Sequence, residues 1–153
     1  MIVFLSVLAI GISFFMGYIH YDILNNNARY ASFLKSFVYE LQNNSRSEML
    51  SFSDVFKSEH EKHFGYKSEV TSNDEIFEVI LSNGKALKGT NKALDALKSY
   101  RSARRDDIEN AEKEMLSEFD KLATEAENKF QKIGKTALII YPMLTAMAVI
   151  LLI

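Results

Sequence analysis

Every Lys, Arg, Asp and Glu of this 153-residue chain lies between Asp22 and Lys135, so both ends of the chain are free of these charges. The length of each uncharged end is close to the ~20 mostly apolar residues that a helix needs to cross a bilayer. The near-neutral mean hydropathy therefore averages two apolar ends and a polar middle. We predict an N-terminal transmembrane helix over residues 1–24, a helical domain over 25–131, and a C-terminal transmembrane helix over 132–153.

The N-terminal segment has a second interpretation as a secretory signal peptide. No Lys or Arg precedes the apolar run, however, and no A-x-A cleavage signal follows it. The helical pattern continues to Leu24, and Tyr18 and Tyr21 are placed as interfacial aromatic residues. We therefore favour a retained transmembrane helix over a cleaved signal.

The basic residues predict the side of the membrane on which the middle domain lies. Lys and Arg accumulate on the cytoplasmic side of membrane proteins. The residues that flank both apolar segments on the side of the middle region are Arg29, Lys35, Lys129, Lys132 and Lys135. We expect a two-span membrane protein with a cytoplasmic middle domain and both chain ends at the far face.

Apolar spacing in the middle region predicts a small all-α bundle. Residues 28–41 repeat apolar side chains every three or four positions, which is typical of an amphipathic helix. A short helix is expected over Ser51–Phe64, with Ser53 or Ser51 as its cap. A third helix is expected from the capping box Ser72-x-x-Glu75 to Gly89. No window alternates apolar and polar residues as a half-buried strand would.

A fourth, much longer helix is predicted to begin at Thr90, its N-cap. Its apolar residues repeat in elevens, which keeps a stripe nearly straight along one helix. The stripe consists of Ile108, Ala111, Met115, Phe119, Leu122, Ala126, Phe130, Ile133 and Ala137. We predict one continuous helix that begins in water and ends in lipid, with a kink near Leu138–Tyr141 caused by Pro142.

The stripe has two interpretations. It could pack only on the earlier helices of its own chain, or its membrane-proximal part could also meet a second protein. Because the earlier helices are too short to cover a helix of about 75 Å, we favour self-packing combined with partner contact. The candidate partner-contact residues in the stripe are Met115, Phe119, Leu122 and Phe130.

A second candidate contact surface is the charged cluster that contains Arg101, Arg104 and Arg105. It could dock a cytoplasmic partner, or it could be an exposed face with weak ion pairs. The solvated-face interpretation is the one we favour.

Residues able to carry chemistry are sparse. The chain has no Cys, which excludes disulfides and thiol catalysis. His60 and His63 share a helix face, but no further His or Cys in the middle region would complete a metal site, so we expect solvated surface histidines. No nucleophile–base set can be assembled, and the net charge of −2 comes with no basic face. We predict no catalysis, metal, cofactor, nucleic acid or small-molecule substrate.

The order of parts, together with several short motifs, resembles the stage III sporulation protein AB family. The resemblance rests on the corner Gly84-Lys85-Ala86-Leu87-Lys88-Gly89-Thr90, in which Gly84, Gly89 and Thr90 would be structural. Further matching positions are Gly17, Tyr18, Arg29, Leu34, Ala126, Lys132, Gly134 and the closing run Val149–Ile153. The family implies a helical domain similar to the cytoplasmic domain of the type II secretion platform protein.

The resemblance also implies a function. It suggests a membrane-anchored platform subunit of a sporulation-specific, secretion-like channel between mother cell and forespore, with the middle domain on the mother-cell side. The implied partners are a cytoplasmic ATPase, ring-forming proteins and the lipid bilayer. The alternative is a stand-alone membrane-anchored adaptor that self-associates as a coiled coil through the long helix. A holin-like pore is disfavoured because neither apolar segment has a polar face.

Overall fold

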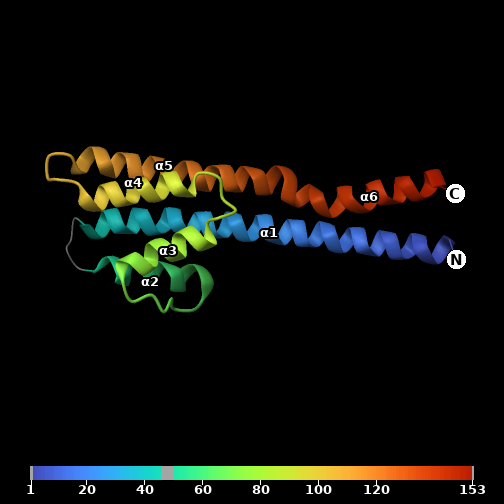
Figure 1. Cartoon of the computed structure of the whole chain (residues 1–153), viewed down its shortest axis with the longest axis horizontal. Coiled ribbons are helices and arrows are strands. Elements are labelled where there is room, and N and C mark those ends of the chain that lie inside the picture. Colours follow the sequence, from blue (N-terminus) through green and yellow to red (C-terminus); the bar gives the residue numbers. More distant parts are fainter. Residues whose placement is uncertain (1, 46–49, 153) are drawn as a thin grey trace. The chain divides into compact units, whose positions relative to one another are not determined.

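The computed structural model of the chain describes residues 2–45 and 50–152, which are almost entirely helical (Figure 1). The elements are α1 (Ile2–Ser45), α2 (Phe52–Phe64), α3 (Asn73–Asn83), α4 (Thr90–Ser102), α5 (Ile108–Lys129), the π-helical turn η1 (Phe130–Gly134) and α6 (Lys135–Leu152). No strand occurs in the described ranges, so the predicted all-α class is confirmed.

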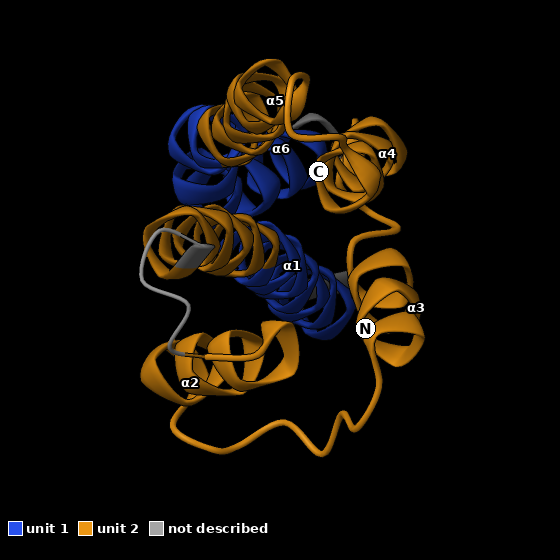
Figure 2. Ribbon diagram, turned by 90° about the vertical axis from the view of Figure 1, so that its left-hand side faces the viewer, with its two compact units in different colours: residues 1–26, 127–153 blue, residues 27–126 orange. Residues whose placement is uncertain are grey.

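The chain forms two compact units, which are coloured separately in Figure 2. Unit 1 contains residues 1–26 and 127–153, and unit 2 contains residues 27–126. The helices α1 and α5 each contribute residues to both units. The predicted boundaries, between residues 24 and 25 and between residues 131 and 132, separate transmembrane helices from the middle domain. They stay a prediction.

The core of unit 2 is built on the second half of α1. Phe33 and Phe37 of α1 and Phe56 of α2 are fully buried, and their rings contact one another. Ser51 is the N-cap of α2, since its hydroxyl accepts from the Asp54 N–H. At the other end, Gly65 adopts a left-handed φ of 81°, which glycine tolerates without a Cβ clash. Both boundaries of α2 agree with the prediction, and of the two candidate caps the structure uses Ser51 and not Ser53.

The capping box of α3 is confirmed, but the end of the helix is earlier than predicted. The Ser72 hydroxyl accepts from the Glu75 N–H, and the Glu75 carboxylate accepts from the Ser72 N–H. The helix then ends at Asn83 and not at Gly89. Thr90 is the first residue of α4 and not its N-cap, a position that Gly89 holds at a φ of 99°.

The predicted continuous helix from Thr90 is wrong, because residues 103–107 interrupt it. Ala103 is extended, and the Asp107 N–H donates to the Arg104 carbonyl in a tight turn. The Asp107 carbonyl then accepts the first helical bond of α5, from the Ala111 N–H. Aspartate is favoured at such a cap position, which explains why α5 begins here.

The helices α4 and α5 therefore form an antiparallel hairpin (Figure 1), with Lys92 Nζ 3.1 Å from Glu118 Oε1. Within unit 2, α1 and α5 are also antiparallel, since Lys35 pairs with Asp120 and Gln42 donates to Glu112. The chain consequently enters and leaves unit 2 at one end, and the α4–α5 turn lies at the other.

In unit 1, α1 packs against η1 and α6 through small residues. A Cβ at Gly17 would lie 2.9 Å from the Ala137 carbonyl oxygen, and one at Gly134 would lie 3.5 Å from the Leu24 Cβ. Such close backbone approach is typical of helix pairs in membranes. The buried residues among those described in unit 1 are Ser13, Gly17, Leu24, Phe130, Gly134, Ala137 and Pro142.

The π turn η1 changes which residue of the eleven-residue stripe lies on the packed face. The repeat places Ile133 on the packed face, but Ile133 is 44 % exposed and its neighbour Gly134 is buried. A π turn holds one residue more than the corresponding α turn, so the position that faces α1 moves along by one. Downstream, Ala137 is also buried.

Within residues 2–45 and 50–152, two helices are long and apolar enough to cross a membrane, by length and composition alone. Little of either apolar window is buried inside the protein. Large apolar side chains on these windows, including Phe15 and Ile150, are instead exposed. The helix α6 continues through Pro142, and the predicted kink there stays a prediction.

Candidate functional site

The stripe residues expected to contact a partner are placed inside the protein. Met115 and Phe119 are fully buried and Leu122 is 3 % exposed, all in the core of unit 2. Phe130 is buried in unit 1, where its ring lies 5.4 Å from that of Tyr21. A partner that contacts either unit in this conformation must therefore use other residues.

The predicted arginine cluster divides into two kinds of residue. The Arg101 guanidinium stacks 4.3 Å from the centroid of the Phe52 ring and also lies over Phe77, so it ties α4 to α2 and α3. Arg104 and Arg105 lie in the α4–α5 turn, are exposed, and form no ion pair with the described residues. These two arginines are the part of the cluster that a partner could reach.

The prediction of solvated histidines on α2 is wrong for His60, while His63 is half-buried. His60 is buried, and its Nδ1 lies 3.0 Å from the Tyr66 carbonyl oxygen among the rings of Phe33, Phe56 and Phe64. The chain after Gly65 folds back over α2, and this reversal, which helical periodicity does not encode, covers the imidazole.

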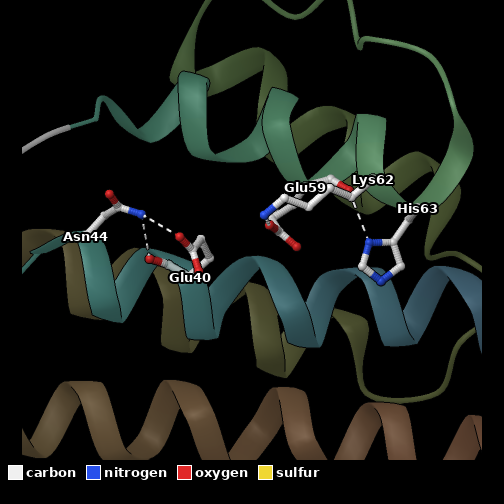
Figure 3. Close-up of polar contacts among 5 residues, drawn as sticks. All are labelled: Glu40, Asn44, Glu59, Lys62 and His63. Atoms are coloured by element: carbon white, nitrogen blue, oxygen red, sulfur yellow. Dashed lines mark hydrogen bonds and ion pairs between the residues drawn. The ribbon is translucent and has the colours of Figure 1, made fainter.

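Figure 3 shows polar contacts within the facing turns of α1 and α2, near His60. The His63 Nδ1 lies 3.1 Å from the Glu59 carbonyl oxygen, and the Lys62 ammonium lies 2.5 Å from the buried Glu59 carboxylate. Asn44 donates to both the backbone and the side chain of Glu40. Each of these contacts lies within one helix, and no grouping of three metal-binding side chains occurs among the described residues.

Tyr30 is a buried titratable side chain, and the apolar spacing of residues 28–41 predicts its position on the packed face of α1. Its hydroxyl donates to the Val79 carbonyl at 3.3 Å. Burial raises the pKa of the phenol above its usual value, while a side-chain contact with Asn83 acts in the opposite direction. The phenol therefore stays neutral and joins α1 to α3.

The corner of Gly84, Gly89 and Thr90 has a structural role. The buried Thr90 hydroxyl donates to the carbonyls of Gly84 at 2.8 Å and Leu87 at 3.0 Å. Both carbonyls also accept backbone N–H groups, from Leu87 and Thr90 respectively, so the hydroxyl adds a second bond to each turn of the corner. The corner fixes how α4 follows α3.

Unit 1 contains a feature that the sequence pattern did not indicate. His20 Nδ1 of α1 lies 2.9 Å from the Tyr141 hydroxyl of α6, and the two rings meet edge to face. A half-open pocket of about 360 Å³ adjoins this pair. Its remaining walls are mostly apolar and include Ile133, Ile140 and Leu144. His20 and Tyr141 are 121 positions apart, so the sequence carries no local signal for this pair.

Comparison with known proteins gives no matching family model, no matching curated protein and no matching solved structure.

Proposed function

We propose that this protein is a membrane-anchored scaffold in which two apolar helices hold a small helical domain at the cytoplasmic face. The observation that carries the proposal is the arrangement of unit 2. Its chain enters and leaves at one end, while Arg104 and Arg105, which are exposed and form no ion pair with another described residue, lie at the opposite end. Within the domain, the arginine turn is therefore away from both passages of the chain.

The resemblance described above suggests the more specific role. We propose a non-catalytic platform subunit of a sporulation-specific, secretion-like channel, with the domain on the mother-cell side. Its partners would be a cytoplasmic ATPase and ring-forming proteins. An acidic surface on the ATPase would suit the guanidinium groups of Arg104 and Arg105, since complementary charge favours encounter and orientation.

Membrane topology is tested first, by single-cysteine labelling in a chain that has no Cys of its own. An Asn91→Cys variant places a thiol on an exposed residue of unit 2. A membrane-impermeant maleimide should label it in inverted vesicles and leave it unlabelled in intact cells. Labelling in intact cells would show that the domain faces outward and would refute the anchored cytoplasmic scaffold.

The partner surface is tested by charge reversal in the full-length chain. We expect Arg104→Glu combined with Arg105→Glu to lose co-purification of the ATPase from sporulating cells. Lys85→Glu combined with Lys88→Glu is the matched control, because it makes the same charge change at exposed positions near the other end of unit 2. Equal loss in both variants, or retention in both, would contradict docking at the turn.

A further inference from the structure

The pocket beside the His20–Tyr141 pair lies within unit 1 and combines apolar walls with a small polar group. Its volume of about 360 Å³ falls within the range of about 300–1,000 Å³ typical of small-molecule sites. Ile140 and Leu144 are 49 % and 62 % exposed, so the pocket opens along the apolar surface of α6. Its shape and lining therefore suit a flexible hydrocarbon chain lying against the helix pair.

The His20–Tyr141 pair offers one further hydrogen-bond donor to an occupant. A neutral imidazole and a phenol have one N–H and one O–H between them, and their mutual bond uses one of the two. If Tyr141 donates to Nδ1, the Nε2–H of His20 remains. If Nδ1–H donates, the Tyr141 O–H remains. In both tautomers one donor is left beside apolar walls, where an ester or phosphate oxygen would accept it.

Basic residues lie immediately before the pocket along the same helix. Lys132 precedes Thr136 by one turn, and the Thr136 hydroxyl donates to the Lys132 carbonyl. Lys129 likewise precedes Ile133 by one π-distorted turn. Both lysines are exposed and form no ion pair with the described residues. Of the nearby acids, Asp22 accepts from Asn26, and Glu127 accepts from Gln131.

We propose that this pocket binds one anionic glycerophospholipid of the surrounding membrane. The acyl chain lies along Ile140 and Leu144, the donor of the His20–Tyr141 pair meets a glycerol ester or phosphate oxygen, and Lys129 and Lys132 face the anionic headgroup. Basic groups beside a pocket between membrane helices on the cytoplasmic side are suited to such headgroups. The inference rests on the proposed membrane anchoring.

The test uses the absence of tryptophan from the chain. Leu144→Trp places a single fluorophore on the pocket, and Met143→Trp places one on the neighbouring residue, which does not line it. The wild-type side chains are 62 % and 58 % exposed, so the two reporters are matched in depth and exposure. Each full-length variant is reconstituted in phosphatidylcholine vesicles with a minor fraction of acyl-brominated phosphatidylglycerol or acyl-brominated phosphatidylcholine.

Brominated phosphatidylglycerol should quench the Leu144→Trp reporter more strongly than brominated phosphatidylcholine does, and should show no such preference at Met143→Trp. A lysine near the membrane surface is expected to enrich an anionic lipid by about fivefold. Adding Lys129→Gln and Lys132→Gln should therefore remove the preference, whereas Lys67→Gln with Lys113→Gln, in unit 2, should keep it. High salt should also weaken it.

Two negative results are distinguishable. Equal quenching of both reporters by both lipids would overturn the lipid site but leave the membrane anchoring intact. No quenching of either reporter would mean that α6 does not lie in the bilayer, which overturns the proposed anchoring as well. A preference that survives neutralisation of both lysines would overturn the assigned headgroup contact.

Discussion

At the residue scale, Gly84 has almost no space around its α-carbon. A Cβ at this position would lie 2.6 Å from Thr90 Cγ2 and 2.7 Å from the Ile80 carbonyl oxygen. Because the second of these is helix backbone, it cannot move aside as a flexible side chain could. We therefore expect Gly84→Ala to lower the free energy of unfolding by about 1–3 kcal/mol, measured by chemical denaturation followed by circular dichroism.

The matched control for Gly84→Ala is Lys85→Ala, next in the chain and exposed. It should leave stability within about 0.5 kcal/mol of the wild type. Equal stability of both variants would mean that the Thr90 corner relaxes easily and does not fix the path from α3 to α4.

Tyr30 predicts how stability depends on pH. Its pKa is raised in the folded protein by burial, so the unfolded chain loses the phenolic proton first as pH rises above about 10. The unfolded state then binds fewer protons than the native state, and the free energy of unfolding falls. At neutral pH, Tyr30→Phe should cost about 0.5–1.5 kcal/mol through the lost bond to Val79. The difference from wild type should shrink in strongly alkaline solution.

The control for the alkaline experiment is Tyr39→Phe, because Tyr39 is 41 % exposed. Denaturation curves of both variants and the wild type at neutral and alkaline pH would separate the effect of Tyr30 from general lysine deprotonation. Parallel pH profiles for the wild type and Tyr30→Phe would contradict a buried neutral phenol.

At the scale of elements, the α4–α5 turn makes a distance prediction. In one straight helix, residues 92 and 118 would be roughly 39 Å apart, since each residue adds 1.5 Å. In the hairpin the side chains of Lys92 and Glu118 meet. Spin labels on Lys92→Cys and Glu118→Cys in the cysteine-free chain should therefore give a short distance by pulsed electron paramagnetic resonance. A distance between the two labels near the straight-helix value would contradict the hairpin and support one continuous helix.

Local signals were sufficient to predict several of these elements. Caps and turn residues marked the ends of α2, and a capping box marked the start of α3. The break after α4 was missed because the stripe was followed only from Ile108. In the region before Ile108, the buried residues Ala93, Leu97 and Tyr100 are spaced four and three apart. A continuous helix with this spacing would place the charged Arg104 on the packed face. That conflict, with two aspartates before Ile108, was the available signal for a turn.

The candidate sites depended less on local sequence. Burial of His60 requires the chain beyond Gly65 to fold back, and the His20–Tyr141 pair joins residues 121 positions apart. Both are set by tertiary packing, which periodicity cannot encode. Residues expected to serve a partner, such as Phe119, were chosen for their apolar character, and the same character places them in the core.

For the whole molecule, burial of the stripe predicts that unit 2 does not self-associate through it. A fragment of residues 27–126 should be helical and monomeric by light scattering coupled to size exclusion. Phe119→Asp should unfold it, because an unpaired carboxylate would replace a fully buried ring. A dimer that this substitution converts to folded monomers would instead support the self-associating adaptor.

The π turn also determines where the molecule tolerates a change in chain length. Because η1 contains one residue more than an α turn with nearly the same rotation, deleting the exposed Gln131 should convert it to α-helix and keep Gly134 and Ala137 facing α1. Deleting the exposed Ser117 within α5 would instead rotate everything after it by about 100°. Thermal unfolding should separate the two deletions. Homologous chains could thus gain or lose one residue at this turn without losing the pairing of their apolar helices.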